Sequence, residues 1–192
     1  IQESNLRGNL VFEEGKIAET ISDRAMVNDL VVLKLKYPPS KKIIARLRSG
    51  MRAIVRTSTR PLLFVSEKIT PMDNILLAYD GSPKGKEALY IAAYFASRYQ
   101  KQISILVIDD NEVRGHKRLE DASNYLNNQI MNLVFKKHSR KTSAIILDVA
   151  EEIGADLILM GGYGFSPVLE IAFGSTVDGV LRGAKIPVMV SK

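Results

Sequence analysis

Cysteine is absent from the chain, and its absence excludes several kinds of chemistry. Disulfides, thiol catalysis and cysteine-ligated zinc are impossible, and a chain without cysteine suits a reducing cytoplasm. No apolar run approaches the roughly 20 residues that a membrane-spanning helix needs, so no membrane segment is expected here. No secretory signal peptide is visible either. The sequence therefore predicts a cytoplasmic location.

Two familiar nucleotide-binding motifs are also missing. The Walker A pattern G-x-x-x-x-G-K-[ST] does not occur. The pattern G-x-G-x-x-G fails because Gly162-Tyr-Gly164 is followed by Phe165-Ser-Pro167. The chain has only two histidines, His116 and His138, both in polar and basic surroundings without a carboxylate at ligand spacing. Surface positions are therefore expected for both, and no metal site.

Positive charge is concentrated in one part of the chain, whose net charge is +6. The stretch from Lys34 to Arg60 contains Lys41, Lys42, Arg46, Arg48, Arg52 and Arg56. No aromatic residue is interleaved with these six charges to stack bases, so a solvated helix face is favoured over a nucleic-acid surface. We expect no nucleic-acid partner.

The most informative motif lies between Met160 and Val177. Gly161-x-x-Gly164 is followed, nine residues later, by Gly174-Ser175-Thr176. An apolar run typical of a buried parallel strand precedes the motif, and a helical pattern begins at its end. Glycines let backbone amides approach an anion, and a helix start offers unpaired donors and partial positive charge. The arrangement predicts a phosphate site, although a glycine turn with a Ser/Thr N-cap would explain any one of these residues.

The sequence also repeats itself. The three matching pairs, in the same order, are Asn9–Phe12 with Asn132–Phe135, Asp29–Leu33 with Asp156–Met160, and Arg60–Val65 with Ile186–Val190. The first copy begins only at its middle and has no counterpart of residues 74–131. We therefore predict that residues 1–69 are the C-terminal part of a degenerate repeat and that residues 70–192 are a complete domain. A short polar linker with a proline joins them.

The second copy alternates short apolar strands with helical patterns. Strands are expected at 74–79, 103–108, 133–135, 157–160 and 188–190, and helices at 83–100, 118–131, 142–153 and 175–182. The polar stretch 109–117 is expected to be a loop, and residues 9–12 are expected to repeat the strand that they match in the second copy. This alternation predicts an α/β fold, in which an open five-stranded parallel sheet has helices on both faces and is preceded by the back half of a similar domain. One crevice at the carboxyl ends of the strands can gather Asp80, Asp109 and Gly161.

Side chains with catalytic potential are few. Asp80 has the best case, because an acid that follows a buried strand needs a ligand hydroxyl, Mg²⁺ or a backbone amide as partner. The Asp109-Asp110 pair is open to interpretation as a metal pair or general base, but an acidic loop start is favoured. Ser175 is interpreted as an N-cap and phosphate donor, because no base is placed to activate it as a nucleophile.

Two of these features together resemble the universal stress protein family. They are the strand end Ala78-Tyr-Asp-Gly-Ser82 and the G-x-x-G-x9-G-S pattern of residues 161–175. The resemblance covers 74–192 and, more weakly, 9–66, so the chain looks like part of a tandem universal stress protein. It implies a five-stranded α/β fold of the adenine-nucleotide alpha hydrolase-like kind and, for members with this glycine pattern, binding of ATP.

The resemblance also implies roles for individual residues. Ala78, Tyr79 and Asp80 would line the adenosine and metal side, with Asp80 as a possible Mg²⁺ ligand. Val107 would meet the adenine through its backbone. Met160, Gly161 and Gly164 would flank the ribose and phosphates, and the phosphates would be held by Gly174, Ser175 and Thr176. The first repeat lacks G-x-x-G and has Pro38-Pro39 in the corresponding loop, so no nucleotide is expected there.

Three classes of function stay open at this point. The favoured class is a nucleotide-binding stress or regulatory protein. The second is an enzyme that uses ATP, for which at most slow hydrolysis is expected because no second catalytic cluster is visible. The third is a nucleotide-free interaction module, for example the soluble regulatory tail of a transporter.

The last strand of each repeat is apolar and is expected near a sheet edge, where unpaired backbone groups invite partners. Family members commonly pair through this strand. The resemblance therefore implies that Leu62–Val65 and Val188–Val190 pair with each other, and that a homodimer covers the incomplete first repeat.

Overall fold

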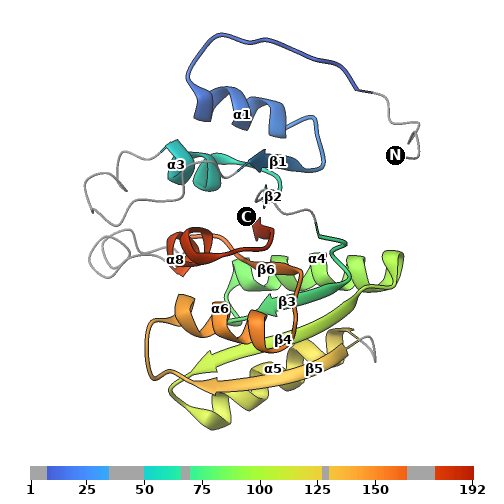
Figure 1. The fold of residues 1–192 in the computed structure, drawn as a ribbon, viewed down its shortest axis with the longest axis vertical. Helices are drawn as coiled ribbons and strands as arrows, with labels where there is room; N and C mark the ends of the chain where they lie inside the picture. Colours follow the sequence, from blue (N-terminus) through green and yellow to red (C-terminus); the bar gives the residue numbers. More distant parts are fainter. Residues whose placement is uncertain (1–7, 35–49, 66–69, 127–129, 164–175) are drawn as a thin grey trace.

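The computed structural model describes residues 8–34, 50–65, 70–126, 130–163 and 176–192. Residues 8–65 are called the N-terminal segment below, and residues 70–192 the C-terminal segment. Figure 1 shows the first in blue to teal and the second in green to red, with the end of the chain between them. Within the described ranges, seven strands form one sheet and six helices pack on its faces.

The elements follow one another in strict alternation along most of the chain. In the N-terminal segment they are α1 (Ile17–Ala25), β1 (Val31–Lys34), α3 (Gly50–Thr57) and β2 (Leu62–Val65). In the C-terminal segment they are β3 (Asn74–Ala78), α4 (Pro83–Tyr99), β4 (Gln102–Asp109), α5 (Glu112–Leu126), β5 (Ile130–Lys137), α6 (Thr142–Glu152), β6 (Leu157–Gly161), α8 (Thr176–Gly183) and β7 (Val188–Ser191).

The two segments share a single sheet, with strand order β1-β2-β7-β6-β3-β4-β5. All neighbours are parallel except β2 and β7, which pair antiparallel with Leu62 opposite Val190 and Phe64 opposite Val188. The predicted pairing of the two last strands is therefore confirmed, as is the α/β class. The predicted five-stranded parallel sheet consists of β7, β6, β3, β4 and β5, in that spatial order. Strands β1 and β2 extend it into a mixed seven-stranded sheet.

The strands are apolar because both faces of the sheet are covered. Along β3, Leu76 faces α6 and α8, whereas Ile75 and Leu77 face α4 and α5. The alternation continues in β2, where Phe64 is 2% exposed and belongs to the same core cluster as Leu76. Helices α1 and α3 cover the sheet on that face, so one hydrophobic core runs through both segments.

Helix α4 begins as its sequence predicts. Ser82 is the N-cap, its hydroxyl accepts the amide of Gly85 at 3.0 Å, and Pro83 occupies the first helical turn. Gln100 ends the helix in the left-handed conformation, with a φ of 54°.

Several expected elements differ from the structure. The helix expected at 118–131 ends at Leu126, and β5 begins at Ile130. Residues 109–117 were expected to be a polar loop, but α5 begins at Glu112, capped by Asn111, whose carboxamide accepts the amide of Arg114 at 2.9 Å. The polar side chains of residues 112–117 lie on the exposed face of this amphipathic helix. Residues 9–12 were expected to repeat a strand, but they form none, and the side chains of Leu10 and Phe12 are 83% and 87% exposed.

Candidate functional site

The candidate site is the carboxyl edge of the sheet where β3 and β6 end side by side. The chain runs from β3 outward to β4 and β5 and then returns to the other side of β3 with β6 and β7. The following helices, α4 and α8, leave these two strands on opposite faces of the sheet. In open α/β sheets such a reversal of strand order is where ligands bind.

Several of the predicted site residues meet at this edge. Ala78 of β3 is in register with Met160 of β6 on one side and with Leu106 of β4 on the other. The backbone amide of Tyr79 donates to the carbonyl of Leu106 at 2.9 Å, so the residue before Val107 is fixed beside the end of β3. Residues far apart in the sequence are thus brought to one short stretch of the edge.

Asp80 lies at this edge with its side chain exposed. Its Oδ1 accepts the backbone amide of Ser82 at 2.9 Å, and Gly81 between them has a φ of +75°. Of the three partners expected for this carboxylate, the structure supplies the backbone amide. The turn therefore orients the Asp80 carboxylate at the N-terminus of α4.

Gly161 has a structural reason to be glycine. A Cβ at this position would lie 2.9 Å from the amide nitrogen of Gly85 and from the carbonyl carbon of Lys84. Ser191 reinforces the contact, since its hydroxyl donates to the carbonyl of Lys84 at 2.9 Å. The missing side chain lets the first turn of α4 pack directly on the end of β6.

Tyr79 differs from its predicted role in one respect. Its side chain is 6% exposed and packs in the core beneath α4 and α5. Burial raises the pKa of Tyr79 above its ordinary value, and the neighbouring carboxylates of Asp121 and Asp80 raise it further. Only the backbone of Tyr79 is therefore placed at the edge.

Asp109, at the end of β4, is a buried and fully paired carboxylate. Arg114 donates to it through Nε at 2.8 Å and through Nη2 at 2.5 Å, and Arg118 donates at 2.5 Å. The amide of Asn111 is a fourth donor at 2.9 Å. Hydrogen bonds from Arg114, together with that amide and the two positive charges, hold the pKa of Asp109 far below its usual range. This carboxylate is a structural anion and not a general base.

The histidines are exposed, as expected, but each lies nearer to a carboxylate than the sequence suggested. Nδ1 of His138 is 3.6 Å from Asp110, and Nε2 of His116 is 3.7 Å from Glu112. Across the described ranges, no group of three or more His, Asp or Glu side chains converges as a metal site. These pairs are therefore surface contacts.

Sequence reasoning missed a cluster around Tyr163. This side chain is 1% exposed and donates from its hydroxyl to the buried Asp178 of α8. Arg52 and Arg56 of α3 lie over its ring. The expected solvated face of this basic helix is wrong for Arg52, which is only 8% exposed. No local pattern signals a contact between segments so distant in sequence.

Three predicted phosphate residues, Gly164, Gly174 and Ser175, lie outside the described residues, as do Lys41 to Arg48. Thr176 is described and begins α8. The described part of the motif therefore consists of its two ends, the exit of β6 and the start of α8.

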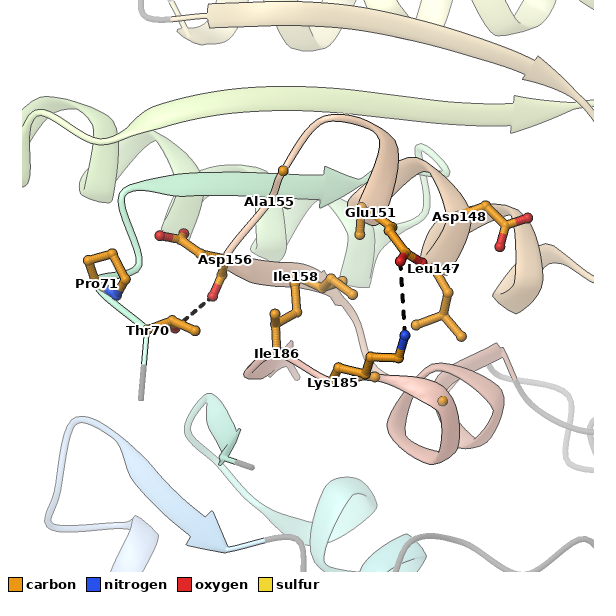
Figure 2. Close-up of a pocket in the computed structure, with 14 residues that line it drawn as sticks. Thr70, Pro71, Leu147, Asp148, Glu151, Ala155, Asp156, Ile158, Lys185 and Ile186 are labelled. Atoms are coloured by element: carbon orange, nitrogen blue, oxygen red, sulfur yellow. Dashed lines mark hydrogen bonds and ion pairs between the residues drawn. The ribbon is translucent and has the colours of Figure 1, made fainter. Parts of the chain in front are cut away.

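A separate pocket of about 440 Å³ opens at the opposite, amino edge of the sheet (Figure 2). Its floor is apolar and includes Ile158 and Ile186, and Lys185 pairs across its rim with Glu151 at 3.9 Å. Thr70 donates to the carbonyl of Asp156 at 2.8 Å on the other side. The pocket lies before the starts of β6 and β7, so it is distinct from the predicted nucleotide site.

Comparisons with known proteins agree with this architecture. Residues 72–192 match the model of the universal stress protein family. A universal stress protein of Synechocystis sp. is 23% identical over 182 residues, which are 94% of this chain and 63% of the relative. A universal stress protein of Archaeoglobus fulgidus has a solved structure with a TM-score of 0.70 and 21% identity, over 91% of this chain and 64% of its own.

A further solved structure is that of a universal stress protein in complex with cAMP. It has a TM-score of 0.52 and 17% identity, over 64% of this chain and 99% of its own. The chain spans less than two thirds of the Synechocystis and Archaeoglobus relatives. Among the described helices, none is long and apolar enough to cross a bilayer.

Proposed function

Because the chain belongs to the universal stress protein family, we propose that its C-terminal segment binds ATP, with Mg²⁺, and has a regulatory or stress-response role. The observation that carries the proposal is the register of Ala78 with Met160. This register brings the two features of the family resemblance, the strand end at Ala78 and the first glycine of the G-x-x-G pattern, to neighbouring strand ends where strand order reverses. A relative solved with cAMP supports an adenine nucleotide as the ligand.

The proposed site divides into two sides. Ala78, the Tyr79 backbone and Val107 form the adenosine side. Asp80 lies at the metal or ribose position, where its exposed carboxylate is held by the Ser82 amide. Met160, Gly161 and Thr176 form the described part of the phosphate side, and Gly164, Gly174 and Ser175 complete it by their place in the motif.

We propose regulation and not catalysis as the use of this nucleotide. Among the described residues, two buried carboxylates lie near the edge and both are paired: Asp109 with Arg114 and Arg118, and Asp178 with the hydroxyl of Tyr163. Neither is placed as a free base. Slow ATP hydrolysis and a nucleotide-free interaction module are the two alternatives. We also propose that residues 1–69 are a degenerate repeat, so that the chain is a tandem form, and that the chain forms a homodimer.

The test is the effect of ATP with Mg²⁺ on thermal unfolding. At a hundredfold excess over the dissociation constant, linkage adds about 2.7 kcal/mol to the free energy of unfolding. For a chain of this length, that raises Tm by roughly 5–10 °C if both segments unfold together. Mass measurement of the native protein as purified, before and after denaturation, checks for bound nucleotide, and release of phosphate from added ATP checks for hydrolysis.

Variants locate the effect. Gly164→Val should abolish the shift, because a β-branched side chain fills the phosphate space. Asp80→Asn should weaken it most when Mg²⁺ is present, whereas Ser175→Ala removes one hydroxyl and should weaken it less. Ser49→Ala, at the corresponding place in the first repeat, is the matched control and should shift like wild type. Absence of both a shift and bound nucleotide in wild type would favour the interaction module.

A further inference from the structure

Tyr163 ties together the two ends of the glycine motif. It lies two residues after Gly161, at the exit of β6, and its side chain is buried. Its hydroxyl donates to Oδ1 of Asp178, which is itself 4% exposed in the first turn of α8. The end of β6 and the start of α8 are thus held by one buried hydrogen bond to a charged acceptor, a contact stronger than a neutral one.

The N-terminal segment packs onto this same ring. The guanidinium carbons of Arg52 and Arg56 lie 5.0 Å and 5.9 Å from the centre of the Tyr163 ring. These arginines are four residues apart on α3, so they project from one face of the helix. A Cβ on Gly162 would lie 3.7 Å from Val55 of the same helix, which shows how closely α3 approaches the exit of β6.

These contacts favour positive charge over the Tyr163 ring. A cation over an aromatic face is attracted by the ring, and the attraction grows when the pair is removed from water. Arg52 meets this condition, because both it and Tyr163 are buried. The two arginines also bring positive charge to a region where the Asp178 carboxylate, near the start of α8, would otherwise oppose an approaching anion.

We propose that Arg52 is a positioning residue for the nucleotide site, acting through Tyr163, so that the N-terminal segment sets the affinity of the C-terminal segment for a nucleoside triphosphate. The proposal rests on the proposed function. The coupling is reciprocal by linkage: if the N-terminal segment raises the nucleotide affinity, bound nucleotide must stabilise the packing of the N-terminal segment to the same extent. An otherwise degenerate repeat thereby has a regulatory use.

The first experiment measures the dissociation constant of ATP with Mg²⁺ by calorimetry, together with Tm of the nucleotide-free protein. Arg52→Gln should weaken ATP binding about tenfold, because it removes a buried cation–π contact whose energy corresponds to about that factor. Arg52→Lys keeps a cation over the ring and should restore most of the affinity. Arg60→Gln, an exposed position just beyond α3, removes the same charge and should bind like wild type. Arg56→Gln, also exposed, keeps the fold and should weaken binding about threefold.

The second experiment measures hydrogen exchange in α3 (Gly50–Thr57) with and without ATP. Exchange should slow on binding in wild type and not in Tyr163→Leu, which removes the ring. If wild type binds ATP but Arg52→Gln and Arg56→Gln bind as tightly as Arg60→Gln and α3 exchange does not respond, this inference is wrong and the proposed function stands. If wild type binds no ATP, both are wrong. Weakening equal in Arg52→Lys and Arg52→Gln would also overturn it, because the cation would then not matter.

Discussion

Gly161 lets the structure and the sequence motif be tested against each other. The motif assigns this glycine to ribose and phosphate binding, which predicts a defect only when nucleotide is present. The structure assigns it to packing, because the first turn of α4 lies against it. Gly161→Ala adds one methyl group at the point where the two explanations differ.

The magnitude follows from the atoms that the methyl group would meet. Three backbone atoms lie within reach, at 2.9, 2.9 and 3.1 Å, in Lys84 and Gly85. Backbone at the capped start of a 17-residue helix cannot move aside as a flexible side chain would. Overpacking of this kind costs about 1–3 kcal/mol. In a chain of this size, 1 kcal/mol corresponds to about 2–4 °C, so Tm should fall by about 2–12 °C.

The assay is thermal and urea unfolding of the nucleotide-free protein. Gly50→Ala is the matched control, because a Cβ there meets nothing within 4 Å and the residue begins α3. Its Tm should equal or slightly exceed that of wild type, since alanine is the better helix former. If Gly161→Ala unfolds at the wild-type temperature without nucleotide and loses only an ATP-dependent shift, the packing argument is refuted.

Three further predictions concern stability. Asp109→Asn should lower the free energy of unfolding at pH 7. The pKa of the wild-type carboxylate is depressed in the folded state, so its contribution to stability is fully present above the unfolded pKa of about 3.9 and is lost as pH falls through the folded pKa. Urea unfolding should therefore show a wild-type advantage that is constant above about pH 5, begins to shrink below it, and is still shrinking at about pH 3. Asp156→Ala removes a carboxylate that accepts two backbone amides at 3.0 and 2.9 Å, and urea unfolding should show a loss of about 2–4 kcal/mol. Phe64→Ala should lower the free energy of unfolding by about 3–5 kcal/mol, since Phe64 is 2% exposed. Phe12→Ala, at a position 87% exposed, should change Tm little, and equal effects of the two variants would contradict the shared core.

Local sequence features determined much of this protein. The apolar runs specified the strands because strands covered on both faces have no room for polar side chains. Ser82 and Pro83 fixed the start of α4, because an N-cap hydroxyl and a proline act within one turn of the backbone. The apolar last strands of the two copies, together with the family resemblance, predicted that β2 and β7 pair, and they do.

Helix α5 and the stretch at 9–12 show where local patterns mislead. The part of α5 from residue 118 onward was predicted as a helix from its apolar face, whereas its first turns, 112–117, turn only Gly115 inward and so resembled a loop. Residues 9–12 have the same sequence, Asn-Leu-Val-Phe, as residues 132–135 of β5, but they lie exposed and form no strand. The same sequence forms a strand only where a neighbouring strand accepts and donates its backbone hydrogen bonds, as β4 does for β5.

Only the tertiary structure decided how the two segments combine. The antiparallel contact of β2 with β7 merges them into one sheet with a common core, and so brings Arg52 against Tyr163. The fold likewise closed Arg114 and Arg118 around Asp109 and gave Gly161 its packing role against α4. Spacing in a sequence reports contacts within one helix or strand. These contacts join different elements, and they arise from how the sheet is assembled and which helix covers which face.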